Sequence, residues 1–127
     1  MVGQIDVVMR ELETFTSKRV RGLTLNITAN IVEDNPVHTG WSRANWVARI
    51  ATPLVVDLRD VTPNVAGATA RQQQSLAQIA GSYEIGMGKI FISNNVPYIV
   101  RLNEGSSSQA PAGFIQAGVR RGVEAAR

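Results

Sequence analysis

The only histidine of the chain, His38, is the first side chain whose chemistry could serve catalysis or metal binding. It stands in a polar turn beside Thr39 and Gly40. The chain contains no cysteine, and no acidic cluster accompanies the histidine at the spacing that metal ligands need. An isolated histidine of this kind is far more often inert, so we expect neither catalysis nor a metal site here.

Carboxylates that could run acid–base or two-metal chemistry occur in two small groups. Asp57 and Asp60 lie on either side of Arg59, and Glu33 is followed by Asp34. The first group stands where an expected strand ends, and the second closes an expected helix. Carboxylates in such places are typical of solvated loops and helix ends, so we expect no catalytic carboxylate pair.

The segment Gly86–Lys89 is similar to a phosphate-binding loop only in its glycines. It lacks the Walker spacing and the Ser or Thr that should follow the lysine. It also precedes an expected strand, whereas a phosphate loop leads into a helix whose N-terminus meets the anion. A Gly-x-Ser-x-Gly nucleophile motif is absent as well. The sequence therefore predicts a protein that is not an enzyme and holds no cofactor.

Three arginines, Arg120, Arg121 and Arg127, give the last expected helix a basic face. They could contact DNA phosphates or an acidic partner. Cations near the C-terminus of a helix also interact well with its dipole and need no partner. The formal net charge is only +3, which is small for a dedicated nucleic-acid binder, so both interpretations stay open.

The elements that must position these residues belong to one domain, residues 1–127. The hydrophobic fraction of 44% and the charged fraction of 18% are those of a folded protein of this length. No stretch approaches the roughly 20 apolar residues of a membrane span. The first residues lack the basic and apolar regions of a signal peptide. We therefore expect a protein that is soluble in the cytoplasm before it assembles, with no membrane partner.

A long amphipathic helix is predicted from Ile5 to Val32, with Gly22 as a point where it can bend. Such a helix spans roughly 40 Å at 1.5 Å per residue, which is more than a domain of this size needs. We expect part of its apolar face to meet another subunit. Eight side chains recur at helical spacing on that face: Ile5, Val8, Leu12, Phe15, Val20, Leu23, Ile27 and Ile31.

The rest of the chain predicts an α+β fold, with the long N-terminal helix packed on a small antiparallel sheet. Thr52 and Pro53 separate the first two expected strands, which we take as antiparallel neighbours. A peripheral helix and a C-terminal helix complete the fold. The expected elements are strands at 46–51, 54–58 and 89–93, helices at 68–79 and from Pro111 onward, and a short helix or turn at 96–102.

Two segments, Pro36–Trp46 and Asn95–Phe114, together resemble a known family. In order behind the long helix, they bring a Thr-Gly before a polar-aromatic run, a Pro-Tyr, a Glu-Gly-Ser and a Pro before an aromatic residue. This order is similar to that of the tail-completion proteins (neck, or minor tail proteins) of long-tailed bacteriophages. A Gln-rich insertion at 68–80 departs from the family pattern and leaves the particular neck component open.

The resemblance implies structural roles for individual residues. Thr39 and Gly40 would set the turn into the first strand, and Tyr98 would pack beneath the sheet. Glu104 and Gly105 would shape a loop that reaches a neighbouring subunit. The expected assembly residues are Thr39, Gly40, Tyr98, Glu104, Gly105, Ser106, Ser107, Ser108, Pro111 and Phe114, of which Pro111 and Phe114 would dock the last helix.

The function that the resemblance implies is structural. The chain would form a homo-oligomeric ring of six-fold or twelve-fold symmetry at the head–tail junction of the virion. Its partners would be the head-closure or adaptor, terminator and tail-tube proteins, with a passing contact to genomic DNA. A tail terminator or head-closure protein is the sister interpretation. A DNA-binding accessory protein that uses the C-terminal arginines is the alternative of another class.

Overall fold

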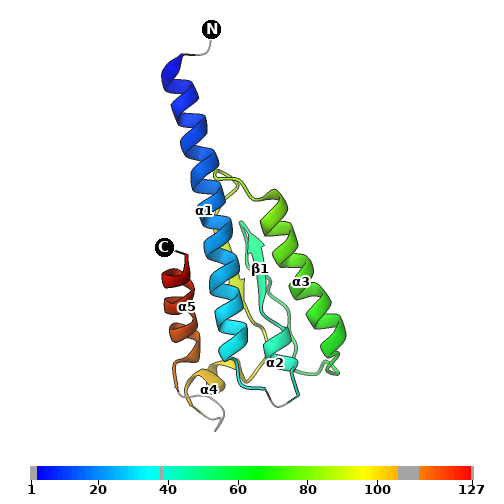
Figure 1. Cartoon of the computed structure of the whole chain (residues 1–127). Helices are drawn as coiled ribbons and strands as arrows, with labels where there is room; N and C mark the ends of the chain where they lie inside the picture. Colours follow the sequence, from blue (N-terminus) through cyan, green and yellow to red (C-terminus); the bar gives the residue numbers. More distant parts are fainter. Residues whose placement is uncertain (1–2, 38, 106–111, 127) are drawn as a thin grey trace.

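The computed structural model describes residues 3–37, 39–105 and 112–126, and it confirms the α+β class (Figure 1). Two short strands pair antiparallel, with Val47 opposite Ser93 and Ile50 opposite Ile90. The elements in chain order are α1 (Gln4–Asp34), α2 (Trp41–Ala44), β1 (Val47–Ile50), α3 (Val65–Ser82), β2 (Ile90–Ser93), α4 (Ile99–Asn103) and α5 (Phe114–Ala125).

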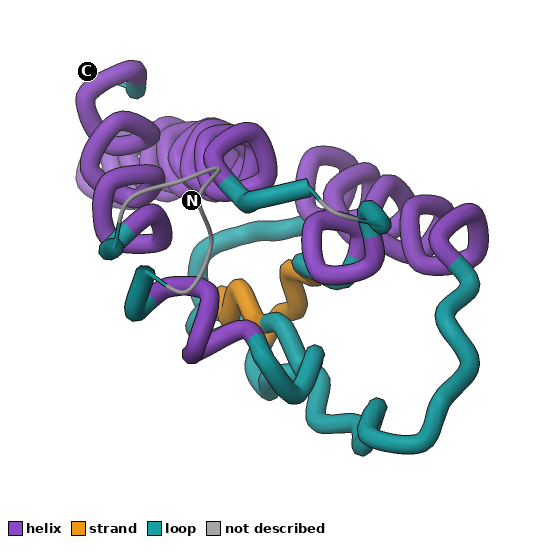
Figure 2. Tube along the Cα trace, turned by 90° about the horizontal axis from the view of Figure 1, so that it is seen from below, coloured by secondary structure: helices purple, strands orange, loops and turns teal. Residues whose placement is uncertain are grey.

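Three helices lie in a row, with the two strands against one side of that row. In the end-on view of Figure 2, α1 lies between α5 and α3, and the strands lie below α1 and α3. The helix α1 is continuous through Gly22 and is somewhat longer than predicted. Its residues 4–16, which we call the arm, precede its first buried residue, Ser17, and extend beyond the other elements in Figure 1.

The main core gathers where the C-terminal end of α1 meets α2, α4 and α5. Its largest fully buried side chain is Phe114, and Trp41 and Trp46 close it from the side of α2. A second, smaller cluster lies under α3, where Ile79 and Tyr83 pack against the sheet. The helix α3 thus lies at the edge of the row, as expected of a peripheral helix, and still contributes to the packing of the sheet.

Two features explain why α3 packs so closely although it carries few large apolar residues. Ala68, which is 1% exposed, lets the helix approach the main core. The amide of Gln72 is buried and donates to the carbonyl of Arg43 at 3.0 Å, so a polar residue serves as a packing residue. Apolar spacing alone could not show either contact.

The strand predicted at 54–58 does not form, and β1 pairs with β2 in its place. Ala51 adopts a left-handed φ of 74° and donates to the carbonyl of Lys89 at 2.7 Å, which ends β1. The carbonyl of Leu54 accepts from the side chain of Asn95 at 2.9 Å, so this segment is held by side chains and not by a ladder. Val55 is 82% exposed, and only Leu58 of the segment is buried.

The contact between α1 and α5 is made through glycines. A Cβ at Gly122 would lie 2.5 Å from Cα of Ile27, and one at Gly118 would lie 2.9 Å from Cα of Ile31. The backbone of α5 therefore packs directly on α1. The apolar spacing of Ile115, Val119 and Val123 predicts that these side chains form the packed face of the helix, but Val119 and Val123 are more than a third exposed. Apolar periodicity in a sequence reflects large side chains only. It therefore does not reveal a helix–helix contact that forms where glycines have no side chain.

Candidate assembly surface

The first motif, Pro36–Trp46, forms a corner that joins the end of α1 to β1 at the lower end of Figure 1. The corner is built around Asn35, the residue just before the motif, which is 2% exposed. The indole Nε1 of Trp46 donates to Oδ1 of Asn35 at 2.8 Å, and Nδ2 of Asn35 donates to Oγ of Ser42 at 2.9 Å. The amide of Asn94 donates to the carbonyl of Ser42 and ties the segment after β2 to the same corner. The motif is thus a buried hydrogen-bonded joint.

Thr39 and Gly40 begin the short helix α2, which leads into β1. Gly40 has a φ of 85°, a conformation that residues with a Cβ rarely adopt. The backbone N–H of Trp41 donates to Oγ1 of Thr39 at 3.3 Å. Both residues therefore shape the turn before the first strand, with a helical turn between them and the strand. His38 lies outside the described residues.

The second motif is organised by Asn103 at the end of α4. Its carbonyl accepts from the N–H of Gly113 at 2.7 Å, and its Oδ1 accepts from the N–H of Ile115 at 3.0 Å. Its Nδ2 donates to the side chain of Gln116. One asparagine thus fixes where α5 begins, although apolar spacing does not single it out. Ser106, Ser107, Ser108 and Pro111 lie outside the described residues.

The residues around α4 divide into buried anchors and an exposed rim. Val96 and Ile99 are buried, whereas Tyr98 is 39% exposed and Val100 is 65% exposed. The resemblance implies that Tyr98 packs beneath the sheet, but its side chain is exposed, and Val96 is the nearby residue that is buried in the main core. Partial burial still raises the pKa of the Tyr98 hydroxyl above its ordinary value.

Glu104 and Gly105 continue the exposed rim at the end of α4. The backbone N–H of Glu104 donates to carbonyls of α4, and the residue is exposed. Gly105 has a φ of 100°, and a Cβ there would lie 3.2 Å from that of Ala112. Gly105 therefore lies close to Ala112, just before the start of α5. Phe114 is 2% exposed and docks α5 in the core, as expected.

The three C-terminal arginines do not form one free basic face. Arg121 reaches the acidic end of α1, where its guanidinium lies 3.0 Å from Oδ1 of Asp34 and donates to Oδ1 of Asn30 at 2.9 Å. A second carboxylate, that of Glu33, lies 3.8 Å away. Arg120 is exposed, and Arg127 lies outside the described residues. Arg121 therefore acts within the fold, as a clamp between α5 and α1.

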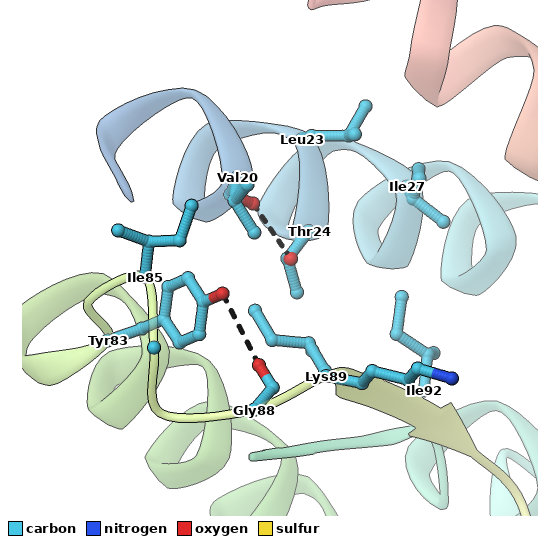
Figure 3. A pocket seen from close by; sticks show the side chains of 11 residues that line it. Val20, Leu23, Thr24, Ile27, Tyr83, Ile85, Gly88, Lys89 and Ile92 are labelled. Atoms are coloured by element: carbon cyan, nitrogen blue, oxygen red, sulfur yellow. Dashed lines mark hydrogen bonds between the residues drawn. The ribbon is translucent and has the colours of Figure 1, made fainter. Parts of the chain in front are cut away.

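An open apolar groove of about 590 Å³ lies between α1 and β2 (Figure 3). Val20 and Ile27 line one side of it, and Ile85 and Ile92 line the other. The hydroxyl of Thr24 is turned back to the carbonyl of Val20 at 2.8 Å. The lining is mostly apolar, and its titratable side chains are Tyr83, whose hydroxyl donates to the carbonyl of Gly88 at 3.4 Å, and Lys89.

Within the described residues, no group of three or more His, Asp or Glu side chains could hold a metal ion. Asp57 and Arg59 form a solvent-exposed ion pair at 2.7 Å, and the Arg59 guanidinium lowers the pKa of the Asp57 carboxyl. Gly86 and Gly88 have positive φ values and lead into β2, away from any helix N-terminus. None of the described helices is long and apolar enough to cross a membrane.

A second exposed surface lies on the arm. Four of its apolar residues, Ile5, Val8, Leu12 and Phe15, are each more than half exposed, and we call them the arm stripe. The first half of the apolar face of α1 is therefore left uncovered by the described part of the chain, and it is the part of that face available to another subunit. Among the residues that the structure describes, the candidate contact surfaces are the rim around α4 and the arm stripe.

Comparisons of the chain with protein-family models, with curated proteins and with solved structures gave no match.

Proposed function

We propose that this chain is a structural protein of the neck of a long-tailed bacteriophage. A ring of its copies would complete the tail and join it to the head connector. The observation that carries the proposal is the arm stripe, which leaves large apolar side chains in solvent on a projecting helix. Apolar surfaces of this kind mark contacts with other chains. The order of the two sequence motifs behind the long helix resembles that of tail-completion proteins, and this resemblance favours the phage neck as the assembly.

The rim around α4 supplies the second surface of the proposed ring. Val100 and Tyr98 offer apolar area, and Glu104 offers a charge, on a short helix anchored by buried Ile99. We assign the main subunit contacts to the segment from Gly105 to Ala110 and to α1. The described part of that segment, Gly105, lies at the same end of the molecule as the start of α5.

The DNA-binding alternative draws less support from the described residues. Arg121, the central residue of the expected basic face, is engaged by Asn30 and Asp34 of α1. A phosphate contact would have to compete with this ion pair. Salt-sensitive binding of the isolated chain to DNA would revive the alternative, because counterion release makes phosphate contacts strongly salt-dependent.

The experiment that tests the proposal is genetic. In a phage that carries this gene, we expect a nonsense mutation to yield filled heads and separate tails, and complementation by the wild-type chain to restore joined virions. Glu104→Lys and a deletion of Ser106–Ser108 should each give a folded chain that fails to complement. A matched control, Glu84→Lys in the exposed loop before β2, should complement fully.

Two results would contradict this assignment. Joined, infectious virions in the absence of the chain would exclude a role at the head–tail junction. Full complementation by both rim variants would exclude the rim as the ring contact. Cryo-electron microscopy of the particle would then place the chain as tail-completion, terminator or head-closure protein.

A further inference from the structure

The arm stripe has the spacing of a two-helix coiled coil. Ile5, Val8, Leu12 and Phe15 follow one another at intervals of three, four and three residues, which is the a/d pattern of a heptad. The next two positions of the same pattern are Arg19 and Gly22. A seam of this kind buries its side chains only against another helix. Within the described residues, no other element covers it.

The seam ends in a hollow of about 400 Å³ beside the C-terminal end of α5. Its lining includes Gly22 and Leu23 of α1 and Ala125 and Ala126 at the end of α5, together with Phe15, Lys18, Arg19 and Asn26. A Cβ at Gly22 would meet nothing within 4 Å, so the fold of a single chain does not require this glycine. The missing side chain leaves a notch on the seam where a large apolar side chain fits.

Charges beside the seam select the occupant. Glu11 and Lys18 are seven residues apart and therefore flank the seam on the same side. Neither forms an ion pair within the described part of the chain. In an antiparallel pair of identical arms, each Glu11 faces the Lys18 of the other copy. The pair therefore contains two equivalent ion pairs between the copies.

We propose that two free copies of this chain pair antiparallel through their arms. In this register, Leu12 of each copy packs on Phe15 of the other. Ile5 of each copy enters the hollow over Gly22 of the other. Val8 lies along the aliphatic part of Arg19, whose guanidinium extends into solvent. A second copy is favoured as the occupant because both the charges and the notch are self-complementary.

Such a contact uses the same patch on both copies and closes at two. It therefore covers the arm stripe before assembly and prevents open-ended association through it. The inference concerns the free chain and does not depend on the virion role. Particle phenotypes test that role, whereas the pairing is tested in purified protein.

The first test is a charge swap measured by sedimentation equilibrium at low ionic strength. The wild-type chain should be a dimer, and Glu11→Lys should raise the dissociation constant roughly tenfold or more, because the substituted lysine then faces Lys18 of the other copy. Lys18→Glu should do the same. The double variant Glu11→Lys/Lys18→Glu should restore pairing. The matched control Glu13→Lys, two residues along on another face, should leave it unchanged.

The second test separates pairing from folding. Gly22→Gln fills the notch in open space and improves helix propensity, so it should weaken the dimer without lowering the thermal stability of the monomer. Because the chain has no cysteine, single cysteines report the register. A mixture of Leu12→Cys and Phe15→Cys chains should give mainly the mixed disulfide.

Three results would overturn the proposal. The first is a wild-type chain that is monomeric at all concentrations or that grows beyond two copies. The second is a swap variant that pairs no better than the single variants. The third is an excess of the disulfide that joins two Leu12→Cys chains, which would indicate parallel arms.

Discussion

The two halves of α1 carry equal sets of apolar residues at similar spacing, but only the second half is covered by its own chain. Ile5 is 78% exposed and Phe15 is 62% exposed, whereas Ile31 is 2% exposed. The second half is covered because Gly118 and Gly122 bring α5 onto its backbone. The arm extends beyond the end of α5 and has no such cover. The spacing of apolar residues thus predicts a helix with an apolar face. It does not predict whether that face is covered by its own chain or by another chain.

The largest effect is expected at Phe114 of the main core, and it is compared with the effect of the same substitution at Phe15 of the arm. Phe114→Ala should lower the free energy of unfolding by about 3–5 kcal/mol, because it empties a site in the main core. Phe15→Ala should change it by less than about 0.5 kcal/mol. Both are measured by urea unfolding in the Glu11→Lys background at low protein concentration, so that pairing adds little to the measured free energy. Equal losses at the two sites would show that the arm is covered within one chain.

Replacing a glycine by alanine at two positions of the molecule tests the same comparison. Gly122→Ala should lower the free energy of unfolding by about 1–3 kcal/mol, because the new methyl group collides with the backbone at Ile27. Gly22→Ala should raise it by about 0.5–1 kcal/mol, because alanine favours the helix and the space is open. Thermal unfolding of the two variants, again in the Glu11→Lys background, gives the signs. Stabilisation by both would mean that α5 does not pack closely on α1.

The sequence predicted the elements better than their contacts. Long periodicity gave α1 within a few residues, and a run of β-branched and aromatic residues gave β2. The partner of β1 could not be predicted from the sequence, because β2 lies some forty residues away and the nearer segment at 54–58 has a better local pattern. Pairing was decided by the turn at Ala51 and by side chains that hold Leu54.

The candidate surfaces show the same limit. Phe114 and Gly40 could be singled out, because an aromatic beside a proline and a glycine in a turn have few other uses. Asn35 and Asn103 could not, because an asparagine in a linker usually faces solvent, and only the fold brings their partners together. Threonine is a weak helix former, yet Thr28 is fully buried within α1 and its hydroxyl bonds back to the carbonyl of Thr24.

A smaller effect is expected where one side-chain hydrogen bond is removed from each region. Asn35→Ala should lower the free energy of unfolding by about 1–3 kcal/mol, because the buried indole N–H of Trp46 loses its acceptor. Thr14→Ala removes an exposed hydroxyl that bonds to Arg10, and should change it by less than about 0.5 kcal/mol. Chemical denaturation measures both. A comparable loss in the arm variant would show that the arm is as tightly anchored as the corner.

The smallest effect concerns the clamp that joins α5 to the end of α1. Arg121→Gln should lower the free energy of unfolding by at most about 1 kcal/mol, because the Arg121 side chain is 47% exposed and water screens its charge. The loss should shrink in 1 M salt, since ion pairs at this exposure are screened while the helix packing is not. Arg120→Gln, which removes the adjacent exposed arginine, should have no measurable effect. If both variants lost the same stability, the cause would be the overall charge of α5, and Arg121 would be free for the phosphate contacts that the clamp otherwise opposes.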